Sequence, residues 1–268
     1  MKKEEIFTRL WKNYIDQNPA AKKIYNLFLE QGETIQNDHI AFRTFNDERV
    51  SIDVIAKPFL DVGYEPKDTY NFDQKHLFAR HYEHKTDQTA PKIFISELIL
   101  EAFSEYLQTL IREKIDEIPE DLLSSSKLIY AGRPWEEPSY TIYEKLRKES
   151  EYAAWMYAYG YQANHFTIFI NQLQRYNSVE EVNKFLKSHG FIMNTSGGEV
   201  KGSPEKGLEQ SSIKANRIEV AFTEGTRIIP ACYYEFAKRY VMKDGQLYQG
   251  FIAQSADKIF ESTDYYQE

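Results

Sequence analysis

Two histidines and one glutamate stand out because each lies on a strand-like segment that is otherwise apolar. His39 begins the run HIAFRTFN, His165 begins HFTIFIN, and Glu219 lies in RIEVAF. Side chains alternate between the two faces of a strand, so each segment has one mostly apolar face and a second face that carries an ionisable group. A sheet that curls so that the second faces converge would bring His39, His165 and Glu219 together.

Two imidazoles and one carboxylate form a well-known type of metal-ligand set. On non-haem Fe(II) this set leaves open positions for oxygen chemistry, and it also suits catalytic zinc, so the residue types do not separate the two metals. For a single strand histidine, a hydrogen-bonded structural role is the more common alternative. Glu219 is harder to explain in that way, because a buried carboxylate without a partner is very costly. If its strand is central, Glu219 needs a cation.

Arg43 lies on the same face of the first strand as His39, four positions later. At about 3.3 Å per residue its backbone is roughly 13 Å further along, and a guanidinium arm can lean back over much of that distance. It can therefore offer a bidentate fork to a substrate carboxylate held at the metal. From position alone, an ion pair with a neighbouring Asp or Glu explains it equally well.

The remaining histidines and the cysteine have simpler explanations. His76, His81 and His84 lie in a charged stretch that is typical of a solvated edge. His189 precedes a glycine at a predicted helix end, where a cation complements the helix dipole. Cys232 lies among aromatic residues, so we expect it to be packed and not nucleophilic.

The order of the expected elements repeats along the chain. Residues 3–31 have the apolar spacing of two helices that break near Asn18–Pro19. The order strand, helix, strands then occurs twice, which we interpret as an internal repeat. We expect one catalytic domain over 1–268, made of N-terminal helices (1–36), a first module (37–98), a helical insertion (99–160) and a second module with the C-terminal segment (161–268). Within the second module, the glycine-rich loop 193–213 lacks the spacing of a phosphate-binding turn, and its role stays open.

Composition narrows the class of protein and of partner. The 268 residues are 42% hydrophobic and 15% aromatic with one cysteine, which excludes a disordered chain and a disulfide scaffold. Asp and Glu outnumber Lys and Arg by 41 to 33, giving a net charge of −8, so nucleic acid and membrane surfaces are poor partners. We recognise no secretory signal and no membrane span, and we therefore expect a cytoplasmic protein.

Five separated segments carry a family resemblance. They are NDHIAFRTF, NHFTIFIN, RIEVAF, PACYYEFAKRY and GFIAQSADKIFESTD, and they extend from about residue 35 to the end of the chain. In this order they resemble the 2-oxoadipate dioxygenase/decarboxylase family in its short form. The resemblance implies an α+β fold of the vicinal-oxygen-chelate type. In that fold, paired βαβββ modules form a curved sheet around one metal site, here with N-terminal helices and a helical insertion.

The resemblance also implies a ligand set and a reaction. His39, His165 and Glu219 match the ligands of Fe(2+), and Arg43 matches a catalytic, substrate-binding arginine. Gln254 falls where the family contacts substrate near the C-terminus, and the two histidines border the same substrate. The implied partners are a small 2-oxo dicarboxylic acid and O2. The implied reaction, in lysine catabolism, converts 2-oxoadipate and O2 to 2-hydroxyglutarate and CO2.

Two other functions stay open at this point. One is a zinc or nickel hydrolase or isomerase of the glyoxalase type, acting on a small carboxylated substrate. The other is a binding module that keeps the fold and has lost the chemistry. The sequence leaves the oligomeric state, the metal, the product stereochemistry and the physiological 2-oxo acid undetermined.

Overall fold

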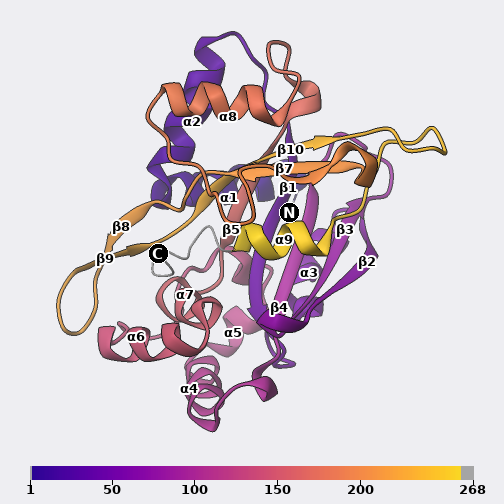
Figure 1. Ribbon diagram of the computed structural model, residues 1–268. Coiled ribbons are helices and arrows are strands. Elements are labelled where there is room, and N and C mark those ends of the chain that lie inside the picture. The colour runs from indigo at the N-terminus through magenta and orange to yellow at the C-terminus, as the bar shows by residue number, and fades with distance from the viewer. Residues whose placement is uncertain (1, 261–268) are drawn as a thin grey trace.

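A mixed β-sheet forms the centre of the molecule, for which a computed structural model describes residues 2–260. The described strands are β1 (Asn37–Phe45), β2 (Tyr64–Phe72), β3 (Leu77–His84), β4 (Lys92–Leu98), β5 (Ala163–Phe169), β6 (Lys201–Ser203), β7 (Leu208–Ser212), β8 (Arg217–Val220), β9 (Arg227–Pro230) and β10 (Tyr233–Arg239). Eight of these form one sheet, in the order β2-β3-β4-β1-β5-β10-β7-β6. Strands β8 and β9 form a separate ribbon (Figure 1).

Helices surround this sheet. The described α-helices are α1 (Lys3–Gln17), α2 (Pro19–Glu30), α3 (Ile52–Leu60), α4 (Glu105–Asp116), α5 (Glu120–Leu123), α6 (Tyr140–Glu149), α7 (Glu151–Tyr159), α8 (Val179–Ser188) and α9 (Ala253–Phe260). Helices α2 and α8 lie together at one end of the molecule, and α4 to α7 group at the other (Figure 1). The predicted break between the first two helices is confirmed. Asn18 caps α2 by accepting a hydrogen bond from the backbone N–H of Ala21.

The sheet contains two modules related by an approximate symmetry. Strands β1 and β5 pair antiparallel at the centre, β1 pairs parallel with β4, and β5 pairs parallel with β10. The first module is β1-α3-β2-β3-β4 and the second is β5-α8-β6-β7-β10, so the predicted repeat and α+β fold class are confirmed. The ribbon β8–β9 is inserted before the last strand of the second module. The segment RIEVAF therefore forms an inserted ribbon strand and not the closing strand that the sequence suggested.

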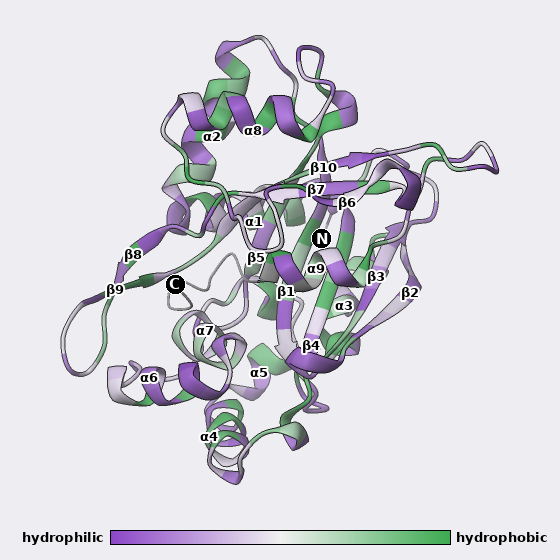
Figure 2. Ribbon diagram, viewed as in Figure 1, coloured by the Kyte–Doolittle hydropathy of each residue, from purple (hydrophilic) through white to green (hydrophobic). Residues whose placement is uncertain are grey.

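The two faces of the central strands differ as their alternation predicts. Phe42 of β1 packs on Phe59 of α3, with ring centroids 5.4 Å apart, and Phe166 of β5 packs on Trp11 of α1 at 5.1 Å. Figure 2 shows both hydrophobic and hydrophilic residues along the strands of the sheet. The opposite face of β1 carries His39 and is covered in part by the C-terminal segment. Burial of the aromatic face fixes which side chains face the other way.

The helical insertion supplies one wall of that second face. Ser150 caps α7 by accepting from the Ala153 N–H, and every α7 residue after the first is buried. A helix that is buried all round lies inside a protein rather than on its surface. The Tyr152 hydroxyl donates to the Ser96 carbonyl of β4 at 2.7 Å, and Trp155 Nε1 donates to the Ala231 carbonyl at 2.7 Å. The insertion is therefore bonded to both modules.

The inserted ribbon is held by the insertion and not by the main sheet. The Glu224 carboxylate, after β8, accepts hydrogen bonds from Ser139 Oγ and from the backbone N–H groups of Tyr140 and Thr141. These groups form the N-terminus of α6, where a carboxylate is favoured by the helix dipole. This contact directs the ribbon away from the centre of the sheet.

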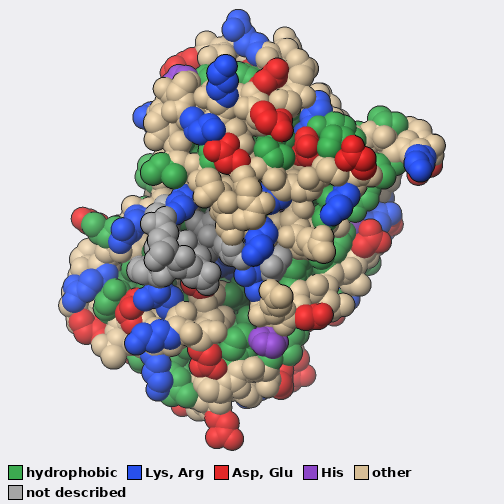
Figure 3. All heavy atoms as spheres, in the orientation of Figure 1, with side chains coloured by type: hydrophobic (Ala, Val, Ile, Leu, Met, Phe, Trp, Pro, Cys, Tyr) green, Lys and Arg blue, Asp and Glu red, His purple; other side chains and the backbone are tan. Residues whose placement is uncertain are grey.

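The described surface is mixed in charge. Acidic and basic side chains are interspersed on the face shown in Figure 3. Within residues 2–260, no helix combines the length and hydropathy needed to cross a bilayer. The exclusion of nucleic acid and membrane surfaces as partners, and the cytoplasmic location, stay predictions.

Candidate metal centre

His39, His165 and Glu235 form a buried cluster on the face of the sheet opposite α1 and α3. Each offers one ligand atom, and these atoms lie within 4.8 Å of one another. The two Nε2 atoms are 3.3 Å apart, and the Glu235 carboxylate lies 3.1 Å from His165 Nε2 and 3.6 Å from His39 Nε2. The strand register brings the three residues together. His165 pairs with Ala41, two residues after His39 on β1, and Thr167, two residues after His165, pairs with Glu235 on β10.

The hydrogen bonds on the far side of each ring determine which nitrogen carries the proton. His39 Nδ1 lies 2.8 Å from Asp38 Oδ1, and His165 Nδ1 lies 3.1 Å from Asn164 Oδ1. Because these oxygens accept, the proton is placed on Nδ1 and the lone pair of each imidazole on Nε2. Two lone pairs and a carboxylate therefore face one another in a buried space. This donor set fits a divalent transition metal.

The pKa shifts favour the ligand forms of these groups. Burial lowers the pKa of His165, and the opposing effect of Glu235 does not overcome it. For Glu235, burial alone raises the pKa, but His39, His165 and a hydrogen bond from Gln210 Nε2 outweigh it, and the pKa lies below its usual range. A neutral imidazole and an ionised carboxylate are the forms that bind metal.

Glu219 does not belong to this cluster, which corrects the third ligand expected from the sequence. It lies on β8 opposite Ile228 and is exposed. The alternation of RIEVAF is that of a half-buried strand, but the strand joins a two-stranded ribbon and not the main sheet. The same criterion, a carboxylate among apolar strand residues, also applies to YYEFAKR, where Glu235 is 1% exposed. That signal was present in the sequence and was missed.

The symmetry of the two modules is broken at the position of Glu235. In the second module His165 pairs with Tyr233 and Thr167 with Glu235, whereas in the first His39 pairs with Lys92 and Ala41 with Phe94. Phe94 thus occupies the place in the first module that Glu235 occupies in the second. The centre receives one histidine from each module but only one carboxylate.

Arg43 lies at the same face, as its position on β1 predicts, and is 3% exposed. Its guanidinium carbon is 4.9 Å from the Tyr152 ring centroid and 5.0 Å from that of Trp155, both on α7. Within the described residues its Nε and Nη1 atoms have no hydrogen-bond partner, and no acidic side chain pairs with it. The ion-pair alternative is therefore not what the structure shows. A buried cation with two free donors is suited to an anionic ligand.

Comparison with known proteins identifies the family to which the chain belongs. The model of the 2-oxoadipate dioxygenase/decarboxylase family matches residues 6–247. This chain belongs to that family. The chloroplastic 2-oxoadipate dioxygenase/decarboxylase of Arabidopsis thaliana is 35% identical over 275 residues, covering 93% of this chain and 74% of the relative.

Two solved structures support the family's fold. The hydroxyglutarate synthase of Oryza sativa, in complex with 2-oxoadipate, matches with a TM-score of 0.92 at 34% identity, covering 98% of this chain and 92% of that one. A glyoxalase-superfamily protein from Ralstonia eutropha JMP134 matches with a TM-score of 0.75 at 20% identity, covering 91% and 83%. The expected vicinal-oxygen-chelate type of fold is thereby confirmed.

In this family member the C-terminal segment reaches the centre through a residue that the sequence did not single out. Gln254, the expected substrate contact, lies in the first turn of α9 and is exposed. Phe251, three residues earlier, packs edge-on against His39 with ring centroids 4.8 Å apart and contacts Phe94 at 4.9 Å. The segment therefore contributes an apolar cover to the centre, and the substrate contact at Gln254 stays a prediction.

One of the histidines assigned to a solvated edge is instead buried. His81 is 1% exposed, with Nδ1 2.9 Å from the Tyr70 hydroxyl and Nε2 3.0 Å from Glu83. Strand β2, which the sequence did not predict, covers this side of β3 and supplies Tyr70. The Tyr70 hydroxyl also accepts the Phe251 N–H at 3.1 Å. His81 thus supports the cover of the centre, whereas His76 is exposed as expected.

Cys232 is packed, as expected, and we predict that it is unreactive in the native family member. The side chain is 1% exposed, and burial raises the pKa of the thiol to about 12. The thiolate is the reactive form, so little of it is present at mildly alkaline pH. A thiol reagent such as DTNB should titrate no cysteine in native protein and one per chain after denaturation. Rapid reaction of native protein would contradict this.

Proposed function

We propose that this protein is an Fe(II)-dependent 2-oxoadipate dioxygenase/decarboxylase. The observation that carries the proposal is the combination of the buried cluster His39, His165 and Glu235 with the unpartnered guanidinium of Arg43 on the same face. The names of the relatives support 2-oxoadipate as the substrate. The reaction we propose converts 2-oxoadipate and O2 to 2-hydroxyglutarate and CO2 as a step of lysine catabolism.

The proposed reaction balances without an added reductant. Oxidative loss of the carboxyl group from the 2-oxo carbon supplies two electrons, and hydroxylation of the adjacent C–H bond supplies two more. One oxygen atom of O2 enters the new carboxylate at the former 2-oxo carbon, the other becomes the hydroxyl group, and CO2 carries both oxygens of the original carboxylate. Fe(II) held by two imidazoles and one carboxylate supplies O2 activation, because this ligand set leaves coordination positions open. The protein's own contribution is to hold the three donors in place and to exclude water.

Arg43 is the residue we assign to the substrate's distal carboxylate. Its planar guanidinium has free donors at Nε and Nη1 that a carboxylate can accept from, and the rings of Tyr152 and Trp155 hold it in place. The buried Tyr233 hydroxyl, which lies near Arg43, offers a further polar group, and the Tyr233 ring stacks on His165 with ring centroids 4.7 Å apart. These groups make a dicarboxylate a better fit than a monocarboxylate.

Oxygen uptake by iron-loaded protein tests the proposal. Protein purified without metal and reconstituted with Fe(II) should consume one O2 for each 2-oxoadipate converted and each CO2 released. A chelator should stop turnover, and added Fe(II) should restore it, because the ligands alone supply no redox chemistry. The glyoxalase-type alternative gains support if the zinc form turns over the substrate without O2. Iron-loaded protein that consumes no O2 with 2-oxoadipate contradicts the proposed function.

A further inference from the structure

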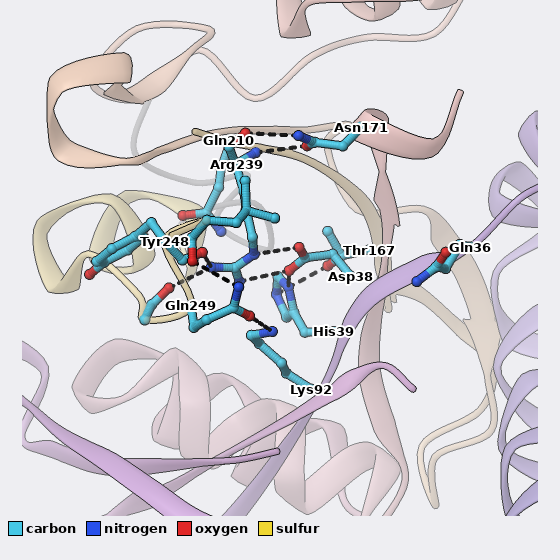
Figure 4. Close-up of polar contacts among 12 residues, drawn as sticks. Gln36, Asp38, His39, Lys92, Thr167, Asn171, Gln210, Arg239, Tyr248 and Gln249 are labelled. Carbon is cyan, nitrogen blue, oxygen red and sulfur yellow. Dashed lines mark hydrogen bonds and ion pairs between the residues drawn. The ribbon is translucent and has the colours of Figure 1, made fainter. Parts of the chain in front are cut away.

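Arg239 forms a buried link between two parts of the chain that lie far apart in sequence. It lies on β10, on the same face as Glu235, and is 2% exposed. Its Nε and Nη2 donate to the two oxygens of Asp38 at 2.6 and 2.9 Å, while Nη1 donates to the carbonyls of Tyr248 and Gly250 at 3.1 and 2.8 Å (Figure 4). One planar guanidinium thus binds a carboxylate and a backbone segment at once.

Asp38 connects this guanidinium to the metal centre. Its Oδ1 also accepts from His39 Nδ1 at 2.8 Å, so Arg239, Asp38 and His39 form a continuous chain of hydrogen bonds (Figure 4). Both Asp38 oxygens accept from the guanidinium, and this buried ion pair holds Asp38 as a carboxylate. An ionised partner on Nδ1 fixes the ring orientation and makes Nε2 a stronger ligand.

The segment at the other end of the link covers the same histidine. Residues 248–251 end at Phe251, whose ring packs edge-on against His39 at 4.8 Å and lies 5.2 Å from the Arg239 guanidinium carbon. Gln249 in this segment makes a separate hydrogen bond at the edge of the centre: its Oε1 accepts from Lys92 Nζ at 2.6 Å (Figure 4). That contact does not pass through Asp38.

We propose that Asp38 and Arg239 are positioning residues that couple metal binding at His39 to closure of segment 248–251 over the centre. The inference rests on the metal site of the proposed function. A metal ion bound to His39 fixes the orientation of the ring. The hydrogen bonds then fix Asp38 and Arg239 as well, and through Arg239 the two backbone carbonyls of the segment. Coupling between two equilibria is reciprocal, so a closed segment strengthens metal binding and bound metal stabilises the closed segment.

The test measures both sides of this coupling in the full chain, with Co²⁺ as a spectroscopic probe. Titration of the Co²⁺ absorption bands gives the dissociation constant, and hydrogen exchange of peptides covering 248–251 reports closure. Asp38→Asn removes the charge with little change of shape, and Arg239→Lys keeps the charge but loses the fork. We expect each variant to weaken Co²⁺ binding about 10- to 100-fold. Saturating Co²⁺ should slow exchange of the segment in the unmodified protein, and much less in the variants.

Two control variants separate positioning from general stability. Gln249→Ala removes the contact with Lys92 but leaves Arg239, Asp38 and His39 intact. Co²⁺ affinity should therefore fall far less than in Asp38→Asn, and saturating Co²⁺ should still slow exchange of the segment. Glu33→Gln alters a buried carboxylate outside the Arg239–Asp38–His39 chain of hydrogen bonds, which accepts the N–H groups of Gln174 and Arg175. It should lower the unfolding midpoint without changing Co²⁺ binding.

The outcomes also separate this inference from the proposed reaction. Co²⁺ affinity within twofold of the unmodified protein in both Asp38→Asn and Arg239→Lys overturns the positioning role, whatever the turnover result. Equal weakening in Glu33→Gln overturns it as well, because the effect would then be one of global stability. Absent Co²⁺ binding by the unmodified protein overturns both the inference and the metal centre. Intact coupling without 2-oxoadipate turnover removes only the proposed reaction.

Discussion

Glu235→Gln is expected to lower 2-oxoadipate turnover by at least about 1,000-fold, because it removes the only carboxylate in the described ligand cluster. The amide is isosteric and neutral and is a poor ligand for a transition metal, so metal content should fall with activity. The fold should survive, since Gln fits the same space and keeps a polar contact with Gln210. Activity of the iron-loaded variant and metal analysis of the purified variant measure the two effects.

Glu219→Gln is the matched control for that experiment. Glu219 is exposed on the β8–β9 ribbon, so its replacement should leave kcat, KM and metal content within about twofold of the unmodified protein, as is usual for a surface position. Strand patterns propose both glutamates as the third metal ligand, and the two variants together decide which of them binds the metal. Loss of metal in Glu219→Gln with retention in Glu235→Gln would reverse our assignment.

Arg43→Met is expected to lower kcat/KM for 2-oxoadipate by roughly 100- to 1,000-fold, the range of about 3 to 4 kcal/mol for a charge-assisted pair of hydrogen bonds in a buried site. The comparison substrate is 2-oxohexanoate, which has the same chain length and no distal carboxylate. Its kcat/KM should change little, so the preference for the dicarboxylate should largely disappear. Arg43→Lys keeps the charge but loses the planar guanidinium. Its kcat/KM for 2-oxoadipate should lie between those of the unmodified protein and Arg43→Met.

The stability of the metal-free Arg43→Met variant gives a second measurement. The guanidinium is buried without a carboxylate in the described structure, so its removal relieves a desolvation cost. We expect the unfolding midpoint to stay the same or to rise. A large fall in the midpoint would indicate a structural role for Arg43. Equal losses of kcat/KM for both substrates would contradict the assignment to the distal carboxylate.

Strand alternation was sufficient to place His39, His165 and Arg43 on one buried face of the sheet. Each lies on a strand whose opposite face is strongly apolar, so burial of that face determines where the polar side chain points. The repeat placed the two histidines at equivalent positions, and β1 and β5 pair directly in the sheet. These features depend on local sequence and on one pairing between neighbouring strands.

The third ligand depends on information that strand alternation does not contain. RIEVAF and YYEFAKR have similar patterns, and only the sheet order shows that the second closes the module. The contact of Glu224 with the N-terminus of α6 joins residues 84 positions apart, and the bonds between Asp38 and Arg239 join residues 201 positions apart. Strand β2 was missed because Pro66 and the polar residues after it resemble a loop, although they form an edge strand with an irregular register.

The presence of Phe94 at the first-module position that corresponds to Glu235 determines how many negative charges the centre contains. Two neutral imidazoles and one carboxylate leave a divalent ion with one unit of positive charge unneutralised. If the proposed divalent ion is held there, an anionic 2-oxo acid bound beside it would supply the missing negative charge, and Arg43 would face the acid's second carboxylate. A glutamate at position 94 would already cancel that charge and compete for a coordination position. Because position 94 is an aromatic residue, the buried metal cluster becomes electrically neutral only when an anionic ligand binds.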